Sequence, residues 1–327
     1  MRRRPKAQAS TETRVECRNC ASGSHVISQK IPGGFGVTLF FFISGFIITR
    51  GLLVDCHLRS FYIRRVFRLM PALLVFVAFI AAVQPVVFGD MAAALLYYAN
   101  FHTFTMSFDH TWSLAVEEHF YFLFPLLVLM LPVSRLQAVL FLVVAAAPIW
   151  RLVLIDLGQV ERIHRATDTR FDSIAYGCLL SIMFTRPAWR STLDALSSKK
   201  AMLIGATVLV ACFAVRNEGF RESLRYSLQG LALIPIFCGL FWSESALKWL
   251  RFALENRAMV YIGGISYSLY LYNEIGFIFV DNKYVGFLVI SVPCALLSYY
   301  CIESPARRFG ATVARKTGDS TASSELK

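Results

Sequence analysis

The sequence predicts an all-α fold, a polytopic transmembrane bundle of about nine to ten helices. Apolar residues make up 56% of the 327 residues, and the mean hydropathy is +0.55. The 28 Phe are spread from end to end of the chain. An apolar content this high and this even exceeds what a single soluble core requires. Because each span takes about 20 residues, little of the chain is left for a soluble domain.

Long apolar runs predict the membrane helices in order. They lie near residues 33–54, 69–88, 117–132, 137–155, 171–185, 201–215, 226–243, 258–280 and 284–302. A shorter run, 91–105, is expected to be an interfacial or re-entrant piece. Counting it as a span would place the later basic loops on the wrong side of the membrane.

The basic residues predict the orientation of the bundle. Lys and Arg gather in four segments, at 55–68, 186–200, 244–257 and 307–316. The positive-inside rule places these segments in the cytoplasm. The same rule explains the net charge of +12 better than a nucleic-acid surface does. Membrane lipid is therefore an expected partner, and nucleic acid is not.

The two ends of the chain are polar. Residues 1–32 contain no apolar run that could be a signal peptide or a span, so they form an atypical segment in which an expected first helix is altered or missing. Residues 310–327 are expected to be a disordered cytoplasmic tail, which leaves 33–309 as the membrane domain. Cys17 and Cys20 form a CxxC without a second ligand pair, and no metal is assigned.

Glycines mark the start of the first apolar run, GGFGVTLFFFISGF, at Gly33, Gly34 and Gly36. Two interpretations stay open. Small residues let membrane helices pack closely. Alternatively, glycines at a helix start bring backbone N–H groups close to an anionic or polar ligand.

Two arginines in FYIRRVFRLMP, Arg65 and Arg68, are three residues apart and therefore share one helical face at the membrane boundary. Positive-inside anchoring explains part of this pattern. Guanidinium groups also match phosphate oxygens geometrically, so a cytoplasmic ligand that carries phosphates is an equally good explanation.

Two carboxylates in WSLAVEEHFYFLFP, Glu117 and Glu118, directly precede a strongly apolar run. At least one of them is expected at the membrane boundary or within it, where polar groups are expensive. Capping of a helix N-terminus is a plausible role for Glu118, which leaves Glu117 as the functional candidate. The histidines at 57, 102, 110 and 119 have no motif behind them and are expected to be structural.

Six blocks of the chain, in order, resemble the acyltransferase 3 family of integral membrane enzymes, which transfer acyl groups to sugar hydroxyls and similar acceptors. The blocks are GFGVTLFFFISGFII, YIRRVFRLMPALL, WSLAVEEHFYFLFPLL, RFDSIAYGCLLSI, IGGISYSLYLYNE and YYCIESPARRFG. The resemblance implies an enzyme of a bacterial cytoplasmic (inner) membrane. Its donor would be acyl-coenzyme A, with no bound cofactor besides, and its acceptor a surface or exported glycan or a lipid-linked sugar. An acetyl group is the acyl group expected to be transferred.

The resemblance also implies site residues. The family hallmark is an Arg, ten residues and a His, and Arg14 and His25 keep this spacing. His25 would be the catalytic base, which suits a His near neutral pH, and Arg14 would position it or bind the donor.

Further roles implied by the resemblance follow the other motifs. Arg65 and Arg68 would grip the coenzyme A phosphates beside the glycines at 33, 34 and 36. Trp112 and Glu117 would shape the acceptor side. Asn273 stands where relatives usually have His and could only position a group. Glu303, in a Glu-x-Pro motif near Arg307, could orient a loop.

Two other functions stay open. The residues between Arg14 and His25, VECRNCASGS, are unlike a membrane helix, which favours a decayed, non-catalytic paralogue of the same fold. A transporter for a small solute or a lipid-linked sugar would explain the helices and the buried charges. It would not explain six family blocks in order.

Overall fold

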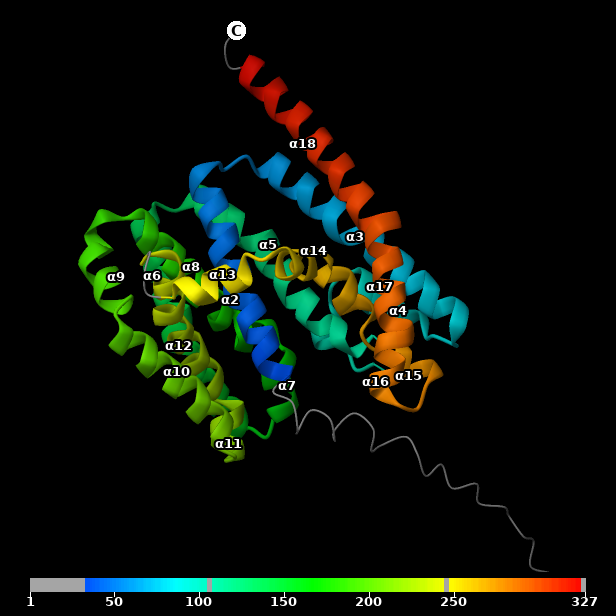
Figure 1. Ribbon diagram of the computed structural model, residues 1–327, viewed down its shortest axis with the longest axis horizontal. Coiled ribbons are helices and arrows are strands. Elements are labelled where there is room, and N and C mark those ends of the chain that lie inside the picture. The colour runs from blue at the N-terminus through cyan, green and yellow to red at the C-terminus, as the bar shows by residue number, and fades with distance from the viewer. Residues whose placement is uncertain (1–32, 105–107, 244–246, 325–327) are drawn as a thin grey trace, which may run out of the picture.

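The computed structural model describes residues 33–104, 108–243 and 247–324. Helices are the sole regular elements in these ranges (Figure 1). The all-helical class predicted from the sequence is therefore confirmed. The helices of the N-terminal half are α2 (Gly33–Val54), α3 (Leu58–Val83), α4 (Phe88–Leu95), η1 (Ala99–Phe101), η2 (Asp109–Thr111), α5 (Trp112–Met130), α6 (Val133–Asp156) and α7 (Val160–Arg165).

The C-terminal half continues the same architecture. It comprises α8 (Thr167–Thr185), η3 (Pro187–Trp189), α9 (Arg190–Leu196), α10 (Lys199–Ala214), α11 (Glu218–Glu222), α12 (Leu224–Phe241), α13 (Lys248–Leu254), α14 (Arg257–Tyr272), α15 (Gly276–Phe279), α16 (Lys283–Gly286), η4 (Phe287–Ser291), α17 (Val292–Ser298), η5 (Tyr299–Glu303) and α18 (Ser304–Ser324). From α16 to α18 the chain is one helical rod with two π-helical stretches, η4 and η5.

Among the described residues, six helices are long and apolar enough to cross a membrane. They are Gly34–Val54, Leu58–Val83, Asp109–Met130, Val133–Asp156, Leu224–Phe241 and Lys283–Thr317. A seventh span results if the pair Pro187–Leu196 and Lys199–Ala214, bent by 69°, is counted as one. The predicted number of nine to ten is not confirmed.

Two of the expected spans account for part of the difference. The apolar run 258–280 is divided between α14 and the short α15, and α14 has 16 residues. The run 171–185 lies in α8, which also carries Asp168, Arg170 and Asp172. The short run 91–105 forms the end of α4 and η1, which are too short to span.

Helix α8 is the centre of the bundle. Most of its residues are buried, and it packs against α2, α6 and α12. Two glycines allow the closest approach, because a Cβ on Gly45 would overlap the Ile174 carbonyl and a Cβ on Gly177 would overlap the Phe42 carbonyl. Close packing through small residues is thus confirmed at Gly45.

Replacing Gly177 with leucine is expected to lower the melting temperature of the detergent-purified protein. The side chain has no space between α8 and α2, and overpacking costs about 1–3 kcal/mol or more. Gly51→Leu is the matched control, because a Cβ on Gly51 meets nothing within 4 Å. Equal melting temperatures for the two variants would contradict this packing.

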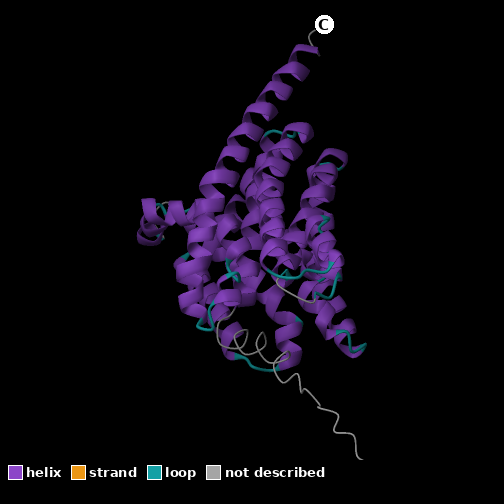
Figure 2. Ribbon diagram, turned by 90° about the vertical axis from the view of Figure 1, so that its right-hand side faces the viewer, coloured by secondary structure: helices purple, strands orange, loops and turns teal. Residues whose placement is uncertain are grey.

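The polar tail is helical rather than disordered. Residues 310–324, which the composition predicted to be disordered, continue α18 as far as Ser324. The reason is contact with α3: Gly310 packs against Phe67, and the Ser60 hydroxyl donates to the Ala314 carbonyl at 3.0 Å. Figure 2 shows α18 rising from the bundle toward the C-terminus.

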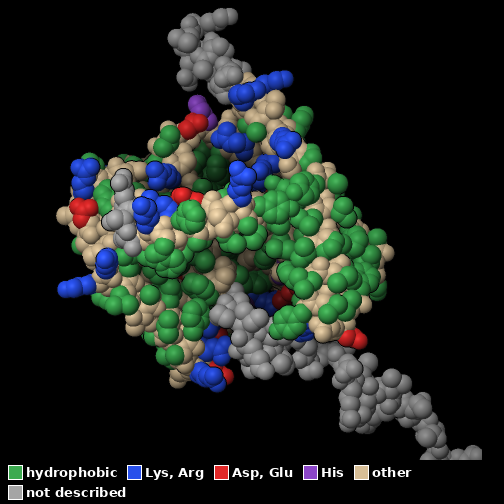
Figure 3. Space-filling view, viewed as in Figure 1, with side chains coloured by type: hydrophobic (Ala, Val, Ile, Leu, Met, Phe, Trp, Pro, Cys, Tyr) green, Lys and Arg blue, Asp and Glu red, His purple; other side chains and the backbone are tan. Residues whose placement is uncertain are grey.

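The two ends of the bundle differ in charge. The loop between α2 and α3 and the outer part of α18 lie at the upper end in Figure 1, and α7 and α11 lie at the lower end. Lys and Arg gather toward the upper end in Figure 3, whereas hydrophobic side chains cover much of the flank. The upper end is the one for which the positive-inside rule predicts a cytoplasmic position.

Candidate active site

Arg65 and Arg68 lie on one face of α3, as their spacing predicts, and both are half-buried. The Arg65 guanidinium carbon lies 3.3 Å from the centroid of the Tyr121 ring. Its Nε lies 3.8 Å from Oε1 of Glu118. The Nε atoms of both arginines are buried and have no hydrogen-bond partner among the described residues.

Glu117 lies in the interior, with 2% of its surface exposed. The hydroxyl groups of Ser44 and Tyr121 lie beside its carboxylate as hydrogen-bonding partners. Its Oε1 has no partner in the described part of the chain. Arg65 is the nearest strong positive charge, so α3 and α5 share a charged contact in the membrane interior.

Glu303, at the end of η5, lies near the same charged side chains. It is 1% exposed and accepts a hydrogen bond from the Ser268 hydroxyl at 2.6 Å. Arg68 and Arg307 are the nearby positive charges. Glu303 is therefore a buried carboxylate held by α14, which excludes a surface ion pair as its role.

Residues predicted separately from three motifs are thus brought together. We name them the arginine–glutamate cluster: Arg65, Arg68, Arg307, Glu117, Glu118 and Glu303. Guanidinium groups with free N–H donors bind phosphate oxygens in fork geometry. The buried carboxylates hold these guanidinium groups in place at low mobility. The cluster has the chemistry of a phosphate-binding site.

The glycines do not join this cluster. Gly33, Gly34 and Gly36 form the first turn of α2, and Ser44 is the α2 residue that lies beside Glu117. Eight residues separate Gly36 from Ser44, which is about 12 Å along a helix. Ser44, rather than these glycines, is thus the α2 residue beside Glu117, and the grouping of the glycines with Arg65 and Arg68 stays a prediction.

Trp112 and Asn273 also lie apart from the arginines. Trp112 begins α5, with its ring centroid 5.3 Å from that of His164 and 6.4 Å from that of Phe41. Asn273 caps the end of α14, where its carbonyl accepts from the Ser291 hydroxyl at 3.1 Å. Arg14 and His25 lie outside the described residues, so the hallmark pair stays a prediction.

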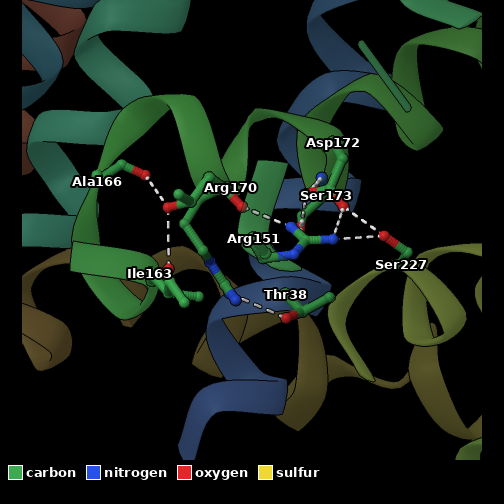
Figure 4. A network of polar contacts seen from close by, with 9 residues as sticks. Thr38, Arg151, Ile163, Ala166, Arg170, Asp172, Ser173 and Ser227 are labelled. Atoms are coloured by element: carbon green, nitrogen blue, oxygen red, sulfur yellow. Dashed lines mark hydrogen bonds and ion pairs between the residues drawn. The ribbon is translucent and has the colours of Figure 1, made fainter. Parts of the chain in front are cut away.

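A buried polar network at α8 was missed by the sequence reasoning. Arg151 on α6 donates to Asp172 at 2.8 Å and to the Ser227 hydroxyl at 2.5 Å (Figure 4). Arg170 lies beside it and donates to the Thr38 hydroxyl at 3.1 Å. Both arginines are almost fully buried. The signal was present in the block RFDSIAYGC, since two charges at the head of an apolar run are functional candidates by default.

A second missed feature is the pair of His110 and Glu274. Nδ1 of His110 lies 3.4 Å from Oε2 of Glu274, and their side chains are 8% and 43% exposed. Tyr270 donates to the His110 carbonyl and shares a hydrogen bond with Ser113. A histidine that faces a carboxylate has the arrangement of a base with its orienting group. The sequence alone gave no motif for it.

Comparison with known proteins agrees with this architecture. A family model described as an acyltransferase domain matches residues 18–302. A protein of Staphylococcus aureus (strain COL) that is named as an O-acetyltransferase is 32% identical to this chain over 342 residues. The aligned part covers 88% of this chain and 55% of that protein. The O-acetyltransferase OatA of S. aureus (strain NCTC 8325 / PS 47) is 28% identical over 334 residues, with the same coverage. No solved structure matches the chain.

The chain belongs to the acyltransferase 3 family of membrane acyltransferases. Together with its apolar helices, this membership indicates a multi-pass membrane protein. The chain spans about half the length of the curated relatives it matches.

Proposed function

We propose that this protein is an O-acyltransferase that moves an acyl group, most simply acetyl, from acyl-coenzyme A to a sugar hydroxyl of a surface or exported glycan. The observation that carries the proposal is the arginine–glutamate cluster. It presents guanidinium N–H groups without partners among the described residues, on helices whose connecting loops are basic. Coenzyme A carries phosphates, which such groups bind.

In the proposed reaction the donor and the acceptor approach from opposite ends of the bundle. A general base takes the proton of the acceptor hydroxyl while its oxygen attacks the thioester carbonyl carbon. The carbon–sulfur bond then breaks, and coenzyme A leaves as a thiolate that takes up a proton. His25 is the proposed base, with Arg14 beside it. Trp112 and Asn273 are proposed to face the acceptor, and Glu117 is proposed as a catalytic residue that shapes the acceptor side.

The location follows from the same features. Relatives named as O-acetyltransferases and the several apolar helices support a bacterial cytoplasmic membrane, with the basic loops facing the cytoplasm. A cytoplasmic donor and an exported acceptor would then approach from opposite ends. No bound cofactor or metal is part of the proposal.

Replacing Arg68 with alanine is expected to raise the KM for acetyl-coenzyme A by about 10- to 100-fold, because a lost charge-assisted hydrogen bond costs about 1.5–3 kcal/mol. Lysine at this position should restore the affinity in part, since it keeps the charge but lacks the fork. Acyl transfer to glycan by membranes that contain the full chain is the measurement.

Arg64→Ala is the control for this variant, because Arg64 is exposed on the same turn of α3. An unchanged KM in Arg68→Ala would remove Arg68 from the donor site. A wild type that transfers no acetyl group, although it inserts and folds normally, would support the decayed-paralogue function instead.

A further inference from the structure

Arg170 carries a positive charge that its surroundings do not balance. It lies on α8 with 1% of its surface exposed. One nitrogen, Nη2, donates to the Thr38 hydroxyl at 3.1 Å, and the guanidinium carbon lies 3.9 Å from the centroid of the Tyr226 ring. Its Nε and Nη1 have no hydrogen-bond partner within the described ranges. Burying a guanidinium group with two unpaired N–H donors costs free energy unless a ligand accepts hydrogen bonds from them.

The neighbouring Arg151 has partners for both of its Nη atoms, whereas its Nε has none among the described residues. Arg151 donates to the Asp172 carboxylate at 2.8 Å and to the Thr169 carbonyl at 2.6 Å (Figure 4). The second carboxylate oxygen of Asp172 accepts from the backbone N–H of Ser173 at 2.8 Å. The hydrogen bonds of Asp172 are thus used by Arg151, by the Ser227 hydroxyl at 2.8 Å and by its own helix. Two buried guanidinium groups share one carboxylate, which leaves a net positive charge around Arg170.

The residues around Arg170 add to this positive potential. His164, on α7, lies with Nδ1 3.2 Å from the Tyr226 hydroxyl. Burial, together with the positive charges of Arg170 and Arg165, lowers the pKa of His164 to about 3. The imidazole is therefore neutral at physiological pH and offers hydrogen bonds without a charge. Arg225 lies on the same ring of Tyr226, with its guanidinium carbon 5.2 Å from the centroid.

The start of α2 meets the same site. Thr38, which accepts from Arg170, donates in turn to the Gly34 carbonyl at 3.1 Å. Among the described residues, a Cβ on Gly34 or Gly36 would meet nothing within 4 Å. Gly34 is thus joined to Arg170 through Thr38, and the grouping of the glycines with Arg65 and Arg68 stays a prediction.

We propose that Arg170, Tyr226 and the first turn of α2 form an oxyanion-binding site, which recognises a phosphate or carboxylate group of the acceptor. The free Nε and Nη1 of Arg170 point to different sides of the guanidinium group, so each supplies one separate charge-assisted donor to an oxyanion. Trp112 and His164 pack together beside it. The site lies toward the end of the bundle opposite the basic loops. The identification of the ligand of this site as the acceptor rests on the proposed function.

Binding without any acyl donor tests this site separately from acyl transfer. The full chain, purified in detergent, is titrated with geranylgeranyl diphosphate, with an oligogalacturonate, and with the uncharged controls geranylgeraniol and a neutral oligosaccharide. We expect at least one anionic probe to raise the melting temperature, and neither uncharged control to do so. A response to the diphosphate indicates a lipid-linked acceptor, and a response to the oligogalacturonate indicates an acidic glycan.

Three variants assign the response to Arg170. Arg170→Gln is expected to bind the active probe about 10- to 100-fold more weakly. Arg162→Gln, which removes an exposed ion pair with Asp168, should bind as the wild type does. Arg68→Ala should also keep the response, which separates this site from the arginine–glutamate cluster. If Arg170→Gln does not fold, Arg170→Lys keeps the charge but lacks the separate Nε and Nη1 donors, and it is expected to lose most of the affinity.

Two results would overturn the proposal: no stabilisation of the wild type by either anionic probe, or equal affinity in the wild type and the folded Arg170 variant. Neither depends on acyl-coenzyme A. A wild type that binds an anion but transfers no acyl group would therefore contradict the proposed function without contradicting the anion site.

Discussion

Replacing Arg65 and Arg68 together with glutamine is expected to reduce acyl transfer at least about 10²-fold, because two charge-assisted contacts to the donor phosphates are lost at about 1.5–3 kcal/mol each. The loss should be in the KM for acyl-coenzyme A first, since these groups bind the donor and do not touch the reacting carbonyl. Initial rates in membranes over a range of donor concentrations measure it.

The control for the double variant removes the same amount of positive charge from the neighbouring surface. Arg59→Gln with Arg64→Gln removes two exposed arginines from the same end of α3. This pair should retain transfer within a few-fold. Similar losses in both double variants would mean that general attraction of an anionic donor, rather than the arginine–glutamate cluster, explains the effect.

Replacing His25 with alanine is expected to lower the rate of acyl transfer by about 10²–10⁴-fold, since a positioned general base typically contributes that much. The reason for choosing His25 is the hallmark spacing from Arg14, which the structure does not describe. Ester on the surface glycan of an acylation-deficient host, complemented with each variant at equal membrane abundance, is the measurement.

His110→Ala is the informative comparison for this prediction. His110 faces the carboxylate of Glu274 at 3.4 Å, so it has the geometry of a base within the described part of the chain. An active His25→Ala together with an inactive His110→Ala would assign the base to His110. In that case Glu274→Gln should also lose activity, because the carboxylate orients the ring.

The sequence predicted the long apolar helices well, because a run of about 20 apolar residues has few alternatives to a membrane helix. The runs at 33–54, 69–88, 137–155 and 226–243 each overlap a helix that passes the length and composition test, although the second and the fourth extend past Val83 and Phe241. Prediction was poorer where polar residues interrupt a run. Composition could not show that α14 ends at Tyr272, or that α18 gains order by packing against α3.

The site was predicted residue by residue but not in its grouping. Arg65, Arg68, Glu117 and Glu303 were named from separate motifs, and the structure brings them together. The grouping of the glycines at the start of α2 with these arginines stays a prediction. The charges of RFDSIAYGC were a sequence signal for Arg170, but its two unpartnered nitrogens are visible only when the surrounding helices are in place.

The central claim is that the arginine–glutamate cluster binds the phosphates of acyl-coenzyme A. Calorimetric titration of the detergent-purified full chain with coenzyme A and with 3′-dephospho-coenzyme A tests it most directly. We expect the wild type to bind coenzyme A at least about 10²-fold more tightly than the Arg65→Gln, Arg68→Gln variant does, and this difference to shrink for the dephospho compound if the arginines hold the 3′-phosphate. Equal affinities of the wild type and the double variant for coenzyme A would contradict the claim.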